Sequence, residues 1–147
     1  MSDWNDRVIA EFRANGGHVE RYGRSLVLLH STGARSGAAR LNPVMAIADG
    51  DGWLVIASAA GAPRSPAWAF NLRAHPEARI EVPADDGAID TVEVRGTALE
   101  GDAWQRAWQR FLDRSPAFAR YREHSGDRDF PIFRLEPIGR RGGVSGF

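Results

Sequence analysis

The sequence contains no cysteine and no lysine, and no apolar run in it approaches membrane-spanning length. The absence of cysteine excludes disulfides, thiolate metal ligands and a cysteine nucleophile together. The first residues do not form a basic stretch followed by an apolar stretch, so they do not match a secretory leader. We therefore expect a cytoplasmic protein without an integral membrane segment.

Charge is balanced, because 19 basic residues, all of them arginine, are matched by 19 acidic residues. A general nucleic-acid binder or membrane-surface binder carries a basic excess, so we expect neither activity. Since every basic residue is arginine, the choice of arginine at one position says little about bidentate recognition. The length of 147 residues and the 43% hydrophobic content predict one domain, 1–147, with a single core.

The order of secondary structure follows from apolar patterning and turn signals. Residues 1–17 are expected to form an N-terminal helix that ends at its glycines. Six strands are predicted, at 25–32, 41–48, 53–58, 77–82, 90–100 and 130–137. Further helices are predicted at 67–75, 102–115 and 116–125. The Gly-rich end, 138–147, is expected to be a flexible tail.

Most of these strands are joined by short turns, so we expect them to pair in an antiparallel arrangement. A six-stranded antiparallel set with few helices favours a closed or split barrel over a parallel sheet. The predicted fold class is mainly β (α+β), with helices at the N-terminal end, in the middle and toward the C-terminal end.

The loop TGARSGAAR (32–40) combines glycines, a hydroxyl and two guanidiniums between two apolar strands. It lacks the Walker pattern, and no helix is predicted after it. Gly33 and Gly37 allow backbone N–H groups to turn inward, and Arg35 and Arg40 suit phosphate or carboxylate through charge-assisted hydrogen bonds. The alternative is a hairpin with solvated arginines, and the loop alone does not decide between them.

A second segment, ASAAGAPRSPAWAFNL (57–72), also has features of an anion site. The Ser65-Pro66 pair is typical of an N-cap followed by proline at the first helical position. A helix that begins there places free N–H donors and a positive dipole beside Ser58 and Arg64. Trp68 and Asn71 follow three positions apart on one helical face; the alternative is that Trp68 packs in the core while Asn71 caps another group.

Other polar and aromatic residues give weaker signals. The four histidines form no HxxxH or HExxH pattern, so no metal site is expected. No GxSxG elbow supports a Ser/His/Asp triad. Trp104 and Trp108 have the spacing of a core face or of an interface, and both interpretations stay open. Phe118 and Tyr121 fit either packing or the lining of a pocket.

Three motifs in order, EFRANGG (11–17), TGARSGAAR followed by NPV, and ASAAGAPRSPAWAFNLRAHPEA (57–78), resemble the deazaflavin-dependent nitroreductase family. The resemblance extends from about residue 5 to residue 137. It implies an FMN-binding split-barrel-like fold and the use of coenzyme F-420, a deazaflavin hydride carrier. It also implies an oxidoreductase that passes a hydride to a quinone, enone or nitro compound.

The resemblance assigns roles residue by residue. Arg35, Ser36 and Arg40 match the loop that holds the phosphate and the anionic oligoglutamate tail. Pro43, Val44 and Met45 match the strand that lines the deazaflavin. The loop around the cofactor and the helix that closes it correspond to Ser58, Gly61, Ala62, Pro63, Arg64, Trp68 and Asn71. Ser58 and Tyr121 are the candidate catalytic residues, as hydrogen-bond donors to the developing oxyanion of the acceptor.

Three departures and two rival functions accompany this hypothesis. The family commonly has two glycines where this chain has Ala60-Gly61, a basic residue where Ala34 stands, and a late segment that is more aromatic than Phe118 and Tyr121. The first rival is an FMN-dependent enzyme on the same barrel, and the second is a non-catalytic carrier of a cofactor or apolar ligand. Split barrels often dimerise, so a homodimer is an open expectation, as is peripheral access to membrane quinones.

Overall fold

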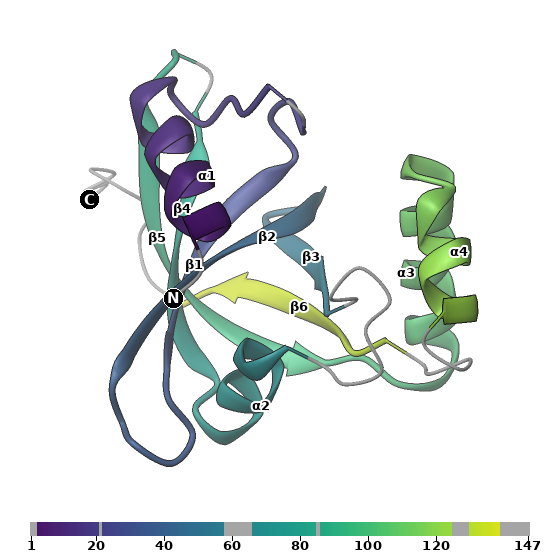
Figure 1. The fold of residues 1–147 in the computed structure, drawn as a ribbon. Coiled ribbons are helices and arrows are strands. Elements are labelled where there is room, and N and C mark those ends of the chain that lie inside the picture. The colour runs from purple at the N-terminus through teal and green to yellow at the C-terminus, as the bar shows by residue number, and fades with distance from the viewer. Residues whose placement is uncertain (1–2, 21, 58–65, 85, 125–129, 139–147) are drawn as a thin grey trace.

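The computed structural model describes residues 3–20, 22–57, 66–84, 86–124 and 130–138 (Figure 1). The strands are β1 (Leu26–Thr32), β2 (Ala39–Asp49), β3 (Gly52–Ile56), β4 (Glu77–Pro83), β5 (Ile89–Ala98) and β6 (Ile132–Pro137). The helices are α1 (Asp3–Ala14), α2 (Ala67–Ala74), α3 (Gly101–Arg114) and α4 (Ala117–His124). None of the described helices has both the length and the apolar character needed to span a bilayer.

The six strands form one closed antiparallel barrel in the order β1-β2-β3-β6-β5-β4. The predicted six-stranded antiparallel barrel is therefore confirmed. Closure depends on the pairing of β1 with β4, in which Leu29 lies opposite Ile80. Strand β2 begins two residues earlier than expected, because Ala39 still pairs with Thr32 at the end of the hairpin. Strands β3 and β5 end two residues earlier than expected, and β6 begins two residues later.

Side chains at alternate strand positions fill the barrel interior, as the pleat of a strand requires. The interior cluster includes Val27 and Leu29 of β1, Phe133 and Leu135 of β6, and residues from every other strand. Helix α2 closes one end of the barrel, where the fully buried Leu72 enters this cluster. Gly96 of β5 lies below it, and a Cβ at that position would stand 2.8 Å from Leu72 Cδ2.

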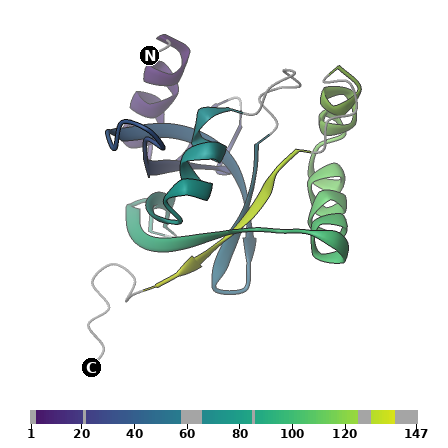
Figure 2. The same ribbon diagram turned by 90° about the horizontal axis from the view of Figure 1, so that it is seen from below.

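Two further apolar clusters lie outside the barrel wall. Helix α1 packs on β1 through a cluster that contains Phe12, Leu26 and Leu28. Helices α3 and α4 lie on the other side, where Trp108 and Phe111 pack against strands β2, β3 and β6. Figure 2 shows this helix pair separated from α1 and from the β1–β2 hairpin.

The tryptophan face of α3 belongs to the core of the described chain. Trp108 is buried, and its ring stacks on Trp104 with a centroid separation of 5.7 Å. The indole Nε1 of Trp104 donates a hydrogen bond to the Phe130 carbonyl at 2.8 Å. Of the two interpretations left open for this face, packing is the one that the fold uses.

Asp49 connects helix α3 to the barrel. Its carboxylate accepts hydrogen bonds from Arg110 of α3 at 2.7 Å and from Arg134 of β6 at 2.9 Å. These contacts hold the pKa of Asp49 below its usual value, and the Arg134 hydrogen bond makes the largest contribution. A carboxylate with a lowered folded-state pKa stabilises the fold above its unfolded-state pKa, and this contribution is lost as pH falls through the folded-state pKa.

We expect Asp49→Asn to lower the free energy of unfolding at pH 7 by about 1 kcal/mol, since ion pairs that reach solvent are screened. The Asp49 side chain is 34% exposed, which is why the effect is modest. The deficit should shrink as pH falls below about 4, where the wild-type carboxylate also becomes protonated. Urea unfolding at several pH values measures it. Asp113→Asn, an exposed change on helix α3, is the control; an equal deficit there would contradict the assignment.

Candidate functional site

The TGARSGAAR segment forms a closed turn between β1 and β2. The Gly33 N–H donates to the Ala38 carbonyl at 2.8 Å, and the Gly37 N–H donates to the Gly33 carbonyl at 2.9 Å. The Ala38 N–H donates to Ser36 Oγ at 3.1 Å. Gly37 has a φ of 70°, and a Cβ on Gly33 would stand 2.6 Å from Ser36 Oγ. The positive φ of Gly37 favours glycine there, and Gly33 leaves room for the Ser36 hydroxyl.

This geometry corrects one expectation about the loop. The glycine N–H groups do not turn toward a ligand, because the loop's own carbonyls already accept their hydrogen bonds. Ser36 Oγ accepts the Ala38 N–H within the turn, and its O–H can still donate to a ligand. Anion binding by this loop therefore depends on side-chain donors, above all the guanidiniums of Arg35 and Arg40, which are both exposed and form no ion pair with any described residue.

A buried amide joins the hairpin to helix α2. The Ala34 N–H donates to Asn71 Oδ1 at 2.9 Å, and Asn71 is only 6% exposed. The β1–β2 hairpin and helix α2 thus lie side by side (Figures 1 and 2). The resemblance assigns both to the cofactor site. Asn71 acts here as the acceptor that fixes the hairpin, in agreement with the alternative that this residue caps another group.

The start of α2 differs slightly from the expected cap. Pro66 occupies the N-cap position itself, with an extended ψ of 154°, and the helix begins at Ala67. The reason is that an N-cap residue has extended backbone angles, which proline adopts readily. Trp68 is buried in the barrel interior and packs on Phe133 with a centroid distance of 6.1 Å. The Trp68 ring therefore packs in the core, although the resemblance assigns its helix to the cofactor site.

The three predicted residues of β2 do not share one face. Val44 is buried in the barrel interior, whereas Met45 points outward and packs against the clusters under α1 and α3. Pro43 is half-buried and pairs with Leu28 of β1. The alternation of a strand explains the separation, because neighbouring residues face opposite sides. Of Val44 and Met45, only Met45 is thus available to a ligand outside the barrel.

Several predicted site residues fall outside the described part of the chain. These are Ser58, Gly61, Ala62, Pro63 and Arg64. Tyr121 lies on helix α4, and its side chain is also outside the described part. Among the residues that are described, no cluster of histidine and carboxylate side chains is arranged to hold a metal ion.

A groove of about 620 Å³ lies between the barrel and helix α4. Its apolar lining comes from Tyr22, Met45 and Phe118, and its cationic lining comes from Arg24 and Arg114. Tyr22 and the two arginines are not among the predicted site residues. Nothing in the local sequence marks them, because they meet only through the packing of α3 and α4 on the barrel.

The comparisons with known proteins give the family. The model of the F420H(2)-dependent quinone reductase family matches residues 4–137, nearly the whole chain. The chain belongs to this family. An F420H(2)-dependent quinone reductase of Mycobacterium tuberculosis is 45% identical over 56 residues, and this match covers 38% of each chain. The matched segment thus spans well under half of that relative's length.

Solved structures extend the likeness over most of the chain. An F420-H2 dependent reductase has 29% identity and a TM-score of 0.66, with 77% of this chain and 95% of that chain covered. A structure described as a domain-swapped dimer has 28% identity and a TM-score of 0.67, with 89% and 93% covered. These likenesses agree with the expected deazaflavin-type barrel.

We predict that Asn71→Ala loosens the hairpin from α2, because the Ala34 N–H loses its buried acceptor. An unmet buried hydrogen bond costs about 1–3 kcal/mol, so the free energy of unfolding should fall by an amount of this order. Hydrogen exchange should accelerate at the Ala34 amide in particular. Gln109→Ala, which removes an exposed amide from α3, serves as the control. Unchanged exchange at Ala34 would contradict the proposed link.

Proposed function

We propose that this protein is an oxidoreductase that transfers a hydride from reduced coenzyme F-420 to a quinone. The observation that supports it most directly is the pair of exposed guanidiniums, Arg35 and Arg40, on a hairpin fixed to α2 by the Ala34–Asn71 hydrogen bond. Membership of the F420H(2)-dependent quinone reductase family names the cofactor and the acceptor class.

The residues present fit the charged part of this cofactor. Its phosphate and carboxylate groups need cationic donors, and a guanidinium supplies several N–H groups in a planar arrangement. Arg35 and Arg40 are separated along the chain by a turn that is held by its own hydrogen bonds. A rigid turn limits the conformational entropy lost when the anion binds.

The bound deazaflavin supplies the hydride, and the protein supplies position and electrostatics. The groove lined by Tyr22, Met45 and Phe118 offers an apolar surface of the kind that a flat quinone ring prefers. Holding donor and acceptor in reactive geometry contributes roughly 7–11 kcal/mol in favourable cases, so an obligatory acid residue is not required. We assign Ser58 and Tyr121 as hydrogen-bond donors to the acceptor oxygen.

Enones and nitro compounds are narrower alternatives for the acceptor, because both accept a hydride at an electrophilic centre. A direct assay follows reoxidation of reduced coenzyme F-420 with 1,4-naphthoquinone, an enone and a nitroarene in parallel. Turnover with the quinone supports the proposal. Tight cofactor binding without turnover would support the carrier function, and purification as a yellow FMN complex would support the flavin alternative.

We also propose a cytoplasmic enzyme that meets lipid-soluble quinones at the membrane surface and forms a homodimer. The proposal of a homodimer is supported by the similar structure that is described as a domain-swapped dimer, at 28% identity. Sedimentation and vesicle flotation test the two parts separately.

Replacing Arg35 or Arg40 with Gln should weaken binding of coenzyme F-420 about tenfold, because each change removes a charge-assisted hydrogen bond. The double variant should also reduce the dependence of affinity on salt. Fluorescence titration of the cofactor at several salt concentrations measures both effects. Arg7→Gln on α1, another exposed arginine, is the matched control. Wild-type affinity and salt dependence in the double variant would contradict the assignment.

Ser58→Ala and Tyr121→Phe should each lower kcat for the quinone by at least roughly tenfold, since each removes a donor to the developing oxyanion. Affinity for the cofactor should stay near the wild-type value if these groups act on the acceptor. Steady-state reoxidation kinetics and cofactor titration separate the two effects. Thr91→Ala, which removes an exposed hydroxyl from β5, controls for general damage. A loss of cofactor affinity with unchanged kcat would overturn the catalytic assignment.

A further inference from the structure

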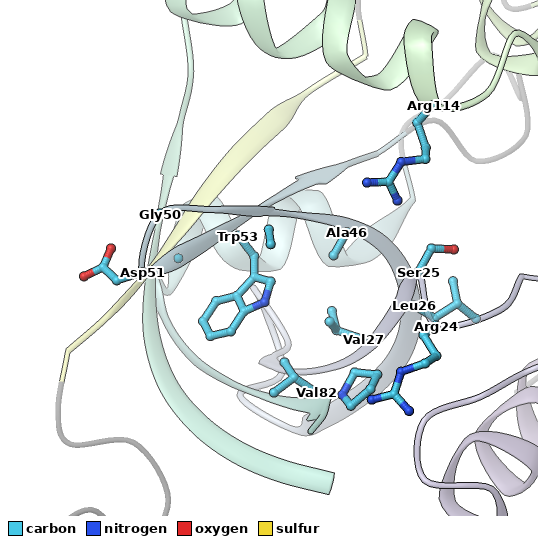
Figure 3. A pocket seen from close by; sticks show the side chains of 13 residues that line it. Arg24, Ser25, Leu26, Val27, Ala46, Gly50, Asp51, Trp53, Val82 and Arg114 are labelled. Carbon is cyan, nitrogen blue, oxygen red and sulfur yellow. The ribbon is translucent and has the colours of Figure 1, made fainter. Parts of the chain in front are cut away.

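A cavity of about 400 Å³ lies at the open end of the barrel, away from α2 (Figure 3). Strand β1 begins at this cavity and ends at the Arg35 hairpin, and its seven residues span about 20 Å at the usual rise per residue. The cavity thus lies at the opposite end of the barrel from the proposed cofactor hairpin.

The inner wall of this cavity is apolar and includes a partly buried indole. Trp53 of β3 projects into the middle of the barrel end, and Val27, Ala46 and Val82 surround it (Figure 3). All four occupy positions that face the barrel interior. Aromatic rings pack favourably on an indole face, and pockets of about 300–1,000 Å³ are the usual size for small ligands.

The rim of the cavity is positively charged. Arg24 and Arg114 lie on one side, and Asp51 lies on the other (Figure 3). Asp51 pairs with Arg134, whose Nη2 is 3.2 Å from Asp51 Oδ1, and it shares this guanidinium with Asp49. The two rim arginines lack such a pairing: Arg24 donates to a neutral backbone carbonyl, and Arg114 has no ion pair within the described part of the chain.

We propose that this barrel-end cavity binds a small aromatic carboxylate, with the ring against Trp53 and the carboxylate at Arg114 and Arg24. The apolar interior disfavours a fully hydrated ion, and the arginine rim disfavours a cation. A guanidinium at the edge of an apolar pocket gives a charge-assisted hydrogen bond in a region partly shielded from water. This cavity shares Arg24 and Arg114 with the outer groove proposed for the quinone, but its inner wall belongs to the barrel interior, and its ligand need not be a substrate.

The probe is 2-naphthoate, with 2-naphthylmethylamine and 2-naphthalenemethanol as the cationic and neutral analogues. Two-dimensional NMR follows the indole N–H signals of the chain's five tryptophans. The signal of Trp53 is the one that disappears in Trp53→Phe. We expect naphthoate to shift this signal most and to bind more tightly than either analogue. Equal binding of the amine, or shifts confined to other tryptophans, would overturn the proposal.

Arg114→Gln should weaken naphthoate binding about tenfold and leave binding of the neutral alcohol unchanged. Arg106→Gln, an exposed change on the same helix, is the matched control and should bind as wild type. Unchanged naphthoate affinity in Arg114→Gln would contradict the role of the rim. Because Arg114 is exposed, this variant is expected to fold, and thermal unfolding checks that it does.

Val82→Phe fills the cavity from strand β4 and should abolish naphthoate binding. If this core change unfolds the protein, the Trp53 indole signal decides between the cavity and the outer groove, because Arg114 lines both. Saturating naphthoate should leave the affinity for coenzyme F-420 unchanged. If 2-naphthoate and coenzyme F-420 displace each other, the proposal of a separate site is overturned. If the quinone assay fails while naphthoate still binds, only the proposed hydride transfer is contradicted.

Discussion

Strand alternation in a closed barrel determines which side chains a ligand can reach. Each residue must face either the interior or the outer wall, because the pleat leaves no third direction. Val44 and Met45 are adjacent in sequence, yet one packs inside the barrel and the other lines the groove beside α4. The same constraint directs Trp53 into the open end of the barrel. The outer groove and the inner cavity therefore take different residues of β2, although they share Arg24, Ser25 and Arg114.

The two ends of the barrel differ because only one has a plug. Helix α2 enters one end with Leu72, and Gly96 provides the space that its side chain occupies. Asn71 on the same helix fixes the hairpin that carries Arg35 and Arg40. A single helix thus combines core packing with the placement of an exposed cationic turn. The far end has no comparable plug among the described residues, and the cavity beside Trp53 is the consequence.

The sequence predicts the helices and strands, but it does not predict which residues from different elements come into contact. Alternation in EARIEV and the DGDG turn predict strands and a hairpin from local signals, and the barrel confirms them. The internal hydrogen bonds of Gly33 and Gly37 are not evident locally, since a glycine-rich loop suits either a closed turn or an anion cradle. Tyr22 and Arg114 are far apart in sequence and line one groove only because α3 and α4 pack on the barrel wall. Tertiary packing, which no local pattern encodes, brings them together.

The partners of each arginine carry information that its residue type does not. In a chain without lysine, arginine serves every cationic purpose, so composition cannot separate structural from functional positions. Arg13, Arg110 and Arg134 are engaged by carboxylates that join helices or turns to the barrel, and an additional anion would have to compete with those carboxylates.

Arg35, Arg40 and Arg114 have no such carboxylate within the described chain, and the same holds for Arg7 on the outer face of α1. Lack of a partner is therefore not sufficient for a site. Arg35 and Arg40 differ from Arg7 because they lie on a hydrogen-bonded turn that is fixed to α2. Arg114 differs because it lies at the rim of the barrel-end cavity. A cation is more easily used as a binding group when its surroundings lower the cost of ordering it, and it is on this ground that both places on the barrel are proposed as sites.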